Sequence, residues 1–221
     1  MKKSLSILAS SCMALSLIFS GCGSEEEVLE PKEVSYGEII ADQNAYENEY
    51  LGMGAKFPAD YQLQSAEELG QNIEDAKAMF KDTELSDEIE NAVMYMDLQV
   101  VDPVTADNVN LIYQELNKKE WTAYAKASDD EIIDAILSQK DELLKSYEGA
   151  GIEVTSMKKG SLTLVGETVP TIETDVEVYG MTMHIVQVAK FNLGGKFGIM
   201  ITFTSADQAG VQAMADAFYA L

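Results

Sequence analysis

The chain offers one histidine for acid–base or metal chemistry, His184. A single histidine excludes a zinc site built from several imidazoles, and a Ser-His-Asp triad would have to recruit His184 alone. The residue lies in the apolar run Met183 to Val186, and no serine near it in sequence sits in a Gly-x-Ser-x-Gly elbow. We therefore expect a histidine that is packed or hydrogen-bonded within a sheet, and the sequence predicts no catalytic residue.

Carboxylates are the second group of reactive side chains, and there are 38 of them. The acidic runs 25–27, 129–131 and 173–177 are explained by a polar tether, a helix start and a solvated strand face. A hydrolase that uses paired carboxylates stays open as an alternative function. It would need two acids with raised pKa values in one cleft.

Oxygen ligands that suit calcium gather in one loop, at Asp102, Asp107 and Asn108. Their spacing misses the EF-hand pattern and lacks its central glycine and closing glutamate. A calcium site near Asp102 is thus left as an alternative, and the sequence predicts neither a metal site nor a cofactor.

An aromatic group surrounds the only tryptophan, Trp121, with Tyr113 before it and Tyr124 after it. If these side chains are exposed together, they could hold a partner or a ligand; otherwise they pack in the core. They are the candidate partner or ligand surface.

The charge balance is strongly acidic, at −23 for the whole chain, and every basic residue is a lysine. Nucleic-acid binding depends on basic clusters and on the arginine fork, so this composition argues against a nucleic-acid partner. A receptor for cations or cationic peptides remains compatible with it.

The N-terminus reads as an export signal, because Met1-Lys2-Lys3 precedes the apolar run Leu5 to Phe19. The sequence Ser20-Gly21-Cys22 that follows resembles the lipobox of bacterial lipoproteins, in which the cysteine is lipidated and becomes the new N-terminus. The resemblance implies a signal peptide over 1–21, lipid attachment at Cys22, and an extracytoplasmic protein held at the cell membrane by its lipid. Without Lys2 and Lys3 the charge of −23 becomes −25.

Residues 22–44 are expected to form an acidic tether. The apolar residues of Tyr36 to Ile40 leave open that this piece packs back on the domain. Cys12 and Cys22 are the only cysteines, so the folded part must be stable without disulfides.

Helical periodicity appears three times in residues 45–221. The stripe Leu69 to Phe80 follows a Ser65/Glu68 capping box, a single long helix is expected from Ser128 to Tyr147 before Gly149 and Gly151, and a Ser205/Gln208 box opens a helix that ends the chain. The other apolar segments alternate as strands do, at 46–50, 54–57, 94–100, 109–116, 152–158, 162–165, 171–178, 181–191 and 197–204.

Short glycine links, including Gly160, separate the C-terminal strands, so these should be antiparallel neighbours. The expected fold class is α+β, a mainly antiparallel sheet flanked by helices, in one domain over 45–221.

The segment Tyr46-Glu47-Asn48, with Gly52 and Phe57-Pro58-Ala59-Asp60-Tyr61, resembles the opening hairpin of PsbP-like domains, and the order of elements to Leu221 is also similar. The resemblance implies an α/β/α layered domain and accessory or binding work, and it carries over no functional residue. The leading hypothesis is a lipid-anchored, non-enzymatic binding or accessory domain of an envelope protein complex.

Overall fold

The computed structural model describes residues 33–221 except residues 82, 84–85 and 179. The expected signal peptide, Cys22 and the first part of the tether lie outside the described residues.

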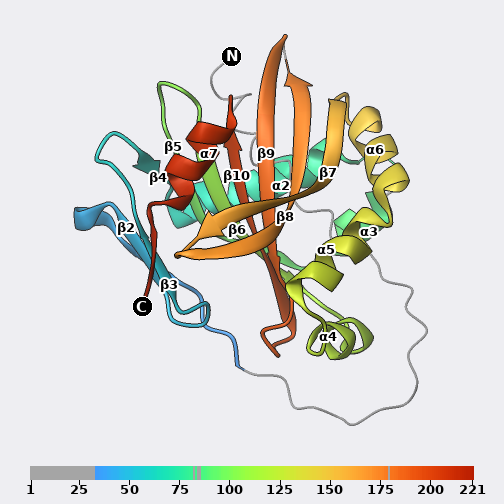
Figure 1. Ribbon diagram of the computed structural model, residues 1–221, viewed down its shortest axis with the longest axis horizontal. Coiled ribbons are helices and arrows are strands. Elements are labelled where there is room, and N and C mark those ends of the chain that lie inside the picture. The colour runs from blue at the N-terminus through green and yellow to red at the C-terminus, as the bar shows by residue number, and fades with distance from the viewer. Residues whose placement is uncertain (1–32, 82, 84–85, 179) are drawn as a thin grey trace.

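A seven-stranded antiparallel sheet forms the centre of the protein (Figure 1). The strand order is β4-β5-β6-β10-β9-β8-β7. The strands are β4 (Gln62–Leu63), β5 (Met94–Val101), β6 (Asn108–Glu115), β7 (Glu153–Leu164), β8 (Glu167–Val178), β9 (Met181–Lys190) and β10 (Phe197–Ser205).

Helices cover one face of this sheet. Their apolar stripes bury Ile133 and Tyr147 against sheet residues such as Ile172 and Ile185. At the β5 end, Leu69 and Ile73 pack on Met96 and Ile112 in the same way. The helices of this layer are α2 (Ala66–Met79), α3 (Ser86–Asn91), α4 (Lys118–Tyr124), α5 (Asp129–Leu137) and α6 (Lys140–Gly149).

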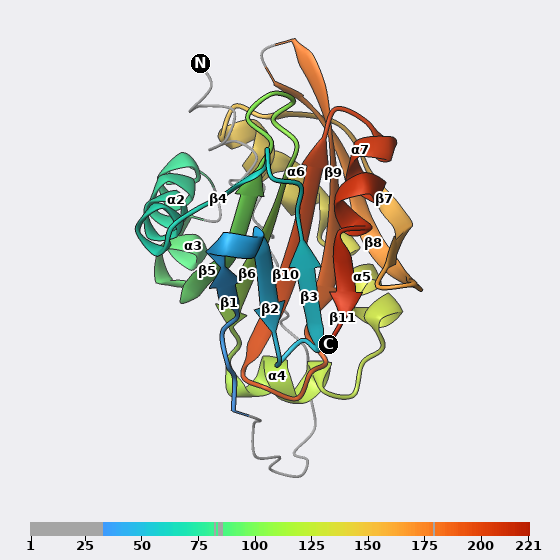
Figure 2. The same cartoon turned by 90° about the vertical axis from the view of Figure 1, so that its left-hand side faces the viewer.

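The opposite face carries a small second sheet and one helix, which Figure 2 shows in front of the large sheet. The small sheet has the order β1-β2-β3-β11, and its core residues pack with the helix against the large sheet. These elements are β1 (Glu38–Ile40), the 3-10 turn η1 (Ala41–Gln43), β2 (Ala45–Asn48), β3 (Met53–Lys56), α7 (Gln208–Ala215) and β11 (Phe218–Ala220). The expected α+β class is confirmed, with a mixed layer of strands and helix on this face.

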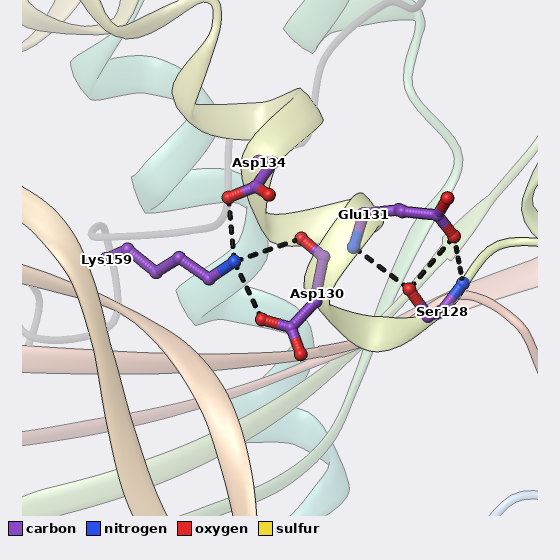
Figure 3. A network of polar contacts seen from close by, with 5 residues as sticks. All are labelled: Ser128, Asp130, Glu131, Asp134 and Lys159. Atoms are coloured by element: carbon purple, nitrogen blue, oxygen red, sulfur yellow. Dashed lines mark hydrogen bonds and ion pairs between the residues drawn. The ribbon is translucent and has the colours of Figure 1, made fainter.

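The predicted capping boxes at Ser65 and Ser128 are both present. Ser128 accepts a hydrogen bond from the backbone N–H of Glu131, and the Glu131 carboxylate accepts one from the Ser128 N–H at 2.8 Å (Figure 3). Beside it, the Lys159 ammonium of β7 lies 2.7 Å from Asp130 and 2.8 Å from Asp134, one turn apart on α5. These contacts hold the start of α5 against the hairpin formed by β7 and β8.

The prediction of one helix from Ser128 to Tyr147 is wrong, because the chain turns after Leu137 and begins α6 at Lys140. The Ser138 hydroxyl donates to the Ala135 carbonyl at 2.6 Å, a local bond that competes with helix continuation. Helix α6 ends as predicted, and Gly151 adopts a left-handed φ of 76°.

The predicted turn at Gly160 is also wrong, since β7 continues through it and pairs with β8 along its whole length. Glycine at 160 lets the Glu173 side chain of the paired strand lie over the backbone, in the space that a Cβ would fill. The hairpin turns instead at Val165-Gly166, where both residues have positive φ, 53° and 77°.

Two predictions for the C-terminus need correction. The cap of α7 is Asp207, whose side chain accepts from the Gly210 N–H at 2.9 Å, and not Ser205. The chain does not end in that helix, because Phe218–Ala220 forms β11 on the edge of β3.

At the N-terminal end, Glu38, Ile39 and Ile40 pair with β2. This is the alternative that the sequence left open for Tyr36 to Ile40, and it places the start of the folded part ahead of Ala45.

Candidate functional site

The structure does not bring the three candidate aromatic residues together on a surface. Tyr113 is fully buried between the two sheets, whereas Trp121 and Tyr124 are buried on the helical side of the large sheet. The Tyr124 ring packs edge-on against Phe191 at 5.2 Å, and burial raises its pKa. The three residues do not form the exposed partner surface, because α4 buries the apolar face that carries Trp121 and Tyr124.

His184 is held within the sheet, as expected. Its Nδ1 lies 2.6 Å from Asp175 Oδ1 on the neighbouring β8, and its Nε2 lies 2.6 Å from Gln208 Oε1 at the start of α7. Ser205 is opposite His184 in the strand register, which puts serine, histidine and aspartate in one row. In a triad, however, Nε2 must face the nucleophile, and here Gln208 occupies that position.

Asp102, the centre of the calcium alternative, stabilises its own loop. Its carboxylate accepts from the Val104 N–H at 2.7 Å and from the Thr105 hydroxyl at 3.0 Å. The backbone bond from Val104 is the main cause of a lowered Asp102 pKa. Within the described residues, no group of three or more His, Cys, Asp or Glu side chains is arranged to hold a metal ion.

Two further carboxyl groups with shifted pKa values, Glu68 and Glu131, belong to the capping boxes of α2 and α5. The pKa values of Glu68 and Glu131 are lowered, chiefly by hydrogen bonds from the backbone of Ser65 and Ser128. A lowered pKa favours the charged form, which is the opposite of what a general acid requires. These groups give no support to the paired-carboxylate hydrolase.

A groove with a volume of about 600 Å³ follows the edge of the large sheet at β5. Helix α2 forms one wall, β1 and the residue before it form the other, and β5 forms the floor. We call this hollow the α2–β5 groove. Its lining residues are Gly37, Glu38, Ile39, Ala66, Leu69, Gly70, Ile73, Glu74, Met94, Tyr95, Met96 and Asp97.

The floor of the α2–β5 groove is an open strand edge. On its outer side β5 pairs with the short β4 through Val100 and Val101 only. Over Met94 to Leu98, no strand among the described residues pairs with that side of β5. An open edge presents backbone N–H and C=O groups, which an added extended segment can pair with.

The charged residues that line the α2–β5 groove all have the same sign. Glu38 and Glu74 are exposed on its two walls, Asp97 lies in the floor, and the lining includes no lysine. Between these acids the surface is apolar, with Tyr95 46% exposed beside Tyr36, and with Met96 and Ile73 packed together on the side of α2. The arrangement suits an extended ligand that carries both cationic and apolar side chains.

Asp97 also fixes the wall of the groove to its floor. The strand register shifts at this residue, between Met96 and Leu98. Its Oδ2 atom accepts hydrogen bonds from the Tyr46 hydroxyl at 2.6 Å, from the Gly37 N–H at 2.8 Å and from Asn48 Nδ2 at 3.1 Å. The groove is therefore preformed, because a β-bulge and buried tyrosine contacts hold β5 against the small sheet.

The sequence does not indicate this groove, because its walls and floor come from three separated segments. The alternation in residues 94–100 correctly predicted the strand, but it does not show which part of the strand edge stays open. The acids Glu38, Glu74 and Asp97 are far apart in sequence and stand out in no local motif.

None of the helices in the described part of the chain is long and apolar enough to cross a membrane. Comparison of the sequence with protein-family models and with curated proteins gives no match.

Proposed function

We propose that the chain is a lipid-anchored, extracytoplasmic binding or accessory domain of the PsbP-like kind, without enzymatic activity of its own. Its α2–β5 groove holds an extended, lysine- or arginine-bearing segment of an envelope protein. The observation that carries this proposal is the open edge of β5 in a groove whose charged lining residues are all acidic.

The binding mode follows from the three kinds of surface in the groove. Cationic side chains of the ligand pair with Glu38 and Glu74, and apolar ones cover Tyr95 and Ile39. The open edge of β5 gives main-chain hydrogen bonds, which supply affinity whatever the ligand sequence. The cationic-receptor alternative and the accessory-domain hypothesis thus describe one function.

The anchor is the part of the proposal that rests on the sequence alone. Residues Ser20-Gly21-Cys22 resemble a lipobox, and accessory or binding work is what the PsbP-like resemblance implies. A lipid-anchored domain meets partners in or at the same membrane at a raised effective concentration, so a site of modest affinity is sufficient.

Binding is tested with two short peptides in which pairs of valines alternate with pairs of lysines in one and with pairs of glutamates in the other, so that each wall of the groove meets both kinds of side chain. The protein is the mature chain with Cys22→Ser, and the measurement is fluorescence polarisation over a range of salt concentrations. We expect the lysine peptide to bind and to retain part of its affinity in high salt, because the apolar and main-chain contacts are not screened. Equal binding of both peptides, or complete loss of the lysine peptide in moderate salt, argues against the groove as the site.

Two variants with the same net charge separate the groove from the general acidity of the surface. Glu38→Gln with Glu74→Gln should weaken binding by roughly two- to fivefold for each charge removed. The matched control, Glu49→Gln with Glu67→Gln, removes two exposed acids that do not line the groove. If both pairs weaken binding alike, only the net charge matters.

The anchor needs its own experiment. When the full chain is expressed in bacteria with a palmitate analogue, we expect label in the membrane fraction and none in a Cys22→Ala variant. Label that persists in the variant would exclude Cys22 as the attachment site.

A further inference from the structure

A second hollow, of about 420 Å³, lies at the other side of the small sheet from the α2–β5 groove and shares no lining residue with it. It opens where the turn of the β7–β8 hairpin meets the β2–β3 turn, the end of β11 and the loop after β9. We call it the hairpin pocket. Its apolar lining includes Leu51, Met53, Leu164, Val165, Val169 and Leu193, and the exposed Glu167 also lines it.

One side of the hairpin pocket is polar and largely buried. The Lys190 ammonium pairs with Asp129 Oδ2 at 2.5 Å, and their side chains are only 20% and 24% exposed. Asn192 donates to the other oxygen, Asp129 Oδ1, at 2.9 Å. Both carboxylate oxygens therefore have donors, while the lysine has donors to spare, because an ammonium group can donate three hydrogen bonds.

A strained residue forms part of the pocket wall. Val165 has a φ of 53°, in the first position of a two-residue turn whose second residue, Gly166, has a φ of 77°. A turn with two positive φ values normally takes Asn-Gly, and a β-branched residue at the first position is an outlier. The turn itself gains nothing from valine, so the side chain must be held by what it contacts. Val165 packs partly buried against the core between the two sheets and also lines the hairpin pocket.

We infer that the hairpin pocket binds a small aliphatic molecule that ends in a hydrogen-bond acceptor, the class of short-chain amides and carboxylates. The aliphatic part contacts Val165 and the apolar wall, and the acceptor takes a hydrogen bond from the Lys190 ammonium. Asp129 keeps the lysine oriented and neutralises its charge. A cationic end gains less there, because an ammonium group cannot accept the Lys190 hydrogen bond and both Asp129 oxygens already have donors. Glu167, the remaining charged lining residue, is exposed to solvent, where an ion pair adds little.

The inference is tested with hexanamide, hexanoate and hexylammonium, titrated into the mature chain with Cys22→Ser. Binding is measured by the shift of the Met53 methyl signal in NMR spectra, since Met53 lines the pocket. We expect the amide and the carboxylate to shift it in a saturable way, and affinity to rise roughly three- to fourfold with each added methylene group. The acidic protein attracts hexylammonium non-specifically, so the net charge cannot explain a preference for the amide and the carboxylate. Hexylammonium binding as tightly as the amide, or no shift with any of the three, would overturn the inference.

Three variants locate the ligand. Val165→Asn suits the turn but loses the partly buried packing of the valine, so the urea midpoint of unfolding should change little. The same substitution should weaken binding of the amide by about threefold or more through loss of apolar contact. Val104→Asn, at an exposed valine outside the pocket, should change neither property. Lys190→Met combined with Asp129→Asn avoids an unpaired buried charge, and it should abolish the preference for acceptor ends while the dependence on chain length remains. A Val165→Asn protein that binds the amide as tightly as the parent would show that the strained valine does not serve the pocket.

Discussion

The Tyr46 hydroxyl donates a 2.6 Å hydrogen bond to Asp97 Oδ2 and so joins the small sheet to the bulged edge strand of the large one. Asn48 extends the contact, because its side-chain amide also donates to the Tyr113 hydroxyl at 2.6 Å. Tyr46, Asn48 and Tyr113 are all fully buried. A polar network in this position specifies one arrangement of the two sheets, and with it the width of the α2–β5 groove.

Replacement of Asp97 by alanine should destabilise the protein by roughly 1–3 kcal/mol, since it leaves buried donors without an acceptor. The measurement is the free energy of unfolding from urea titration. Asp60→Ala removes an exposed aspartate for which a change within about 0.5 kcal/mol is expected. Equal effects of the two substitutions would mean that the network adds no stability.

The same network predicts a loss of stability at high pH. Burial raises the pKa of Tyr46 and Tyr113, and the nearby charge of Asp97 adds to the effect at Tyr46. A phenol with a raised pKa in the folded state stays neutral there, while the unfolded chain ionises above about pH 10. The contribution of such a tyrosine to the free energy of unfolding is therefore complete below pH 10. Above pH 10 the free energy of unfolding declines by about 1.4 kcal/mol per pH unit for each buried tyrosine.

Unfolding titrations at a series of alkaline pH values measure this slope. Tyr46→Phe should reduce the slope of the free energy of unfolding against pH by the contribution of one tyrosine, even though the variant is less stable at neutral pH. An unchanged slope in the variant would show that Tyr46 ionises normally in the folded protein.

The start of α5 gives a third prediction. Ser128→Ala removes the side-chain cap and should lower the free energy of unfolding by about 1 kcal/mol. Ser128→Asp keeps an acceptor at the cap position and should restore most of the loss, which distinguishes capping from a general effect of the substitution. Circular dichroism during urea unfolding reports both. Failure of aspartate to restore stability would argue against the cap.

Local periodicity predicted the parts of the fold that depend on neighbours in sequence. The stripe Leu69 to Phe80 gave α2, the alternation after Met94 gave β5, and Ser65 and Ser128 marked helix starts correctly. Each of these signals lies within one or two helical turns or one strand. The fold class follows from their order.

Features that depend on distant residues were wrong or missed for a physical reason. Gly160 looks like a turn residue until Glu173 of the paired strand is placed over it. Asp97 looks like an outward-facing residue of an alternating strand until Gly37, sixty positions away, donates to it. Both candidate sites are of this kind, because their walls come from segments that only the topology brings together.

The last four residues allow a test of the element that the sequence least suggested. Phe218 belongs to β11, is 5% exposed, and packs edge-on against Phe57 at 6.0 Å and Phe203 at 5.7 Å. Phe218→Ala should therefore destabilise the domain by about 3–5 kcal/mol, since it opens a cavity between the two sheets. Leu221→Ala, three residues later and 53% exposed, should change stability by less than about 0.5 kcal/mol. Urea unfolding of both variants measures the difference, and a small effect of Phe218→Ala would mean that the closing strand contributes little to the packing of the small sheet.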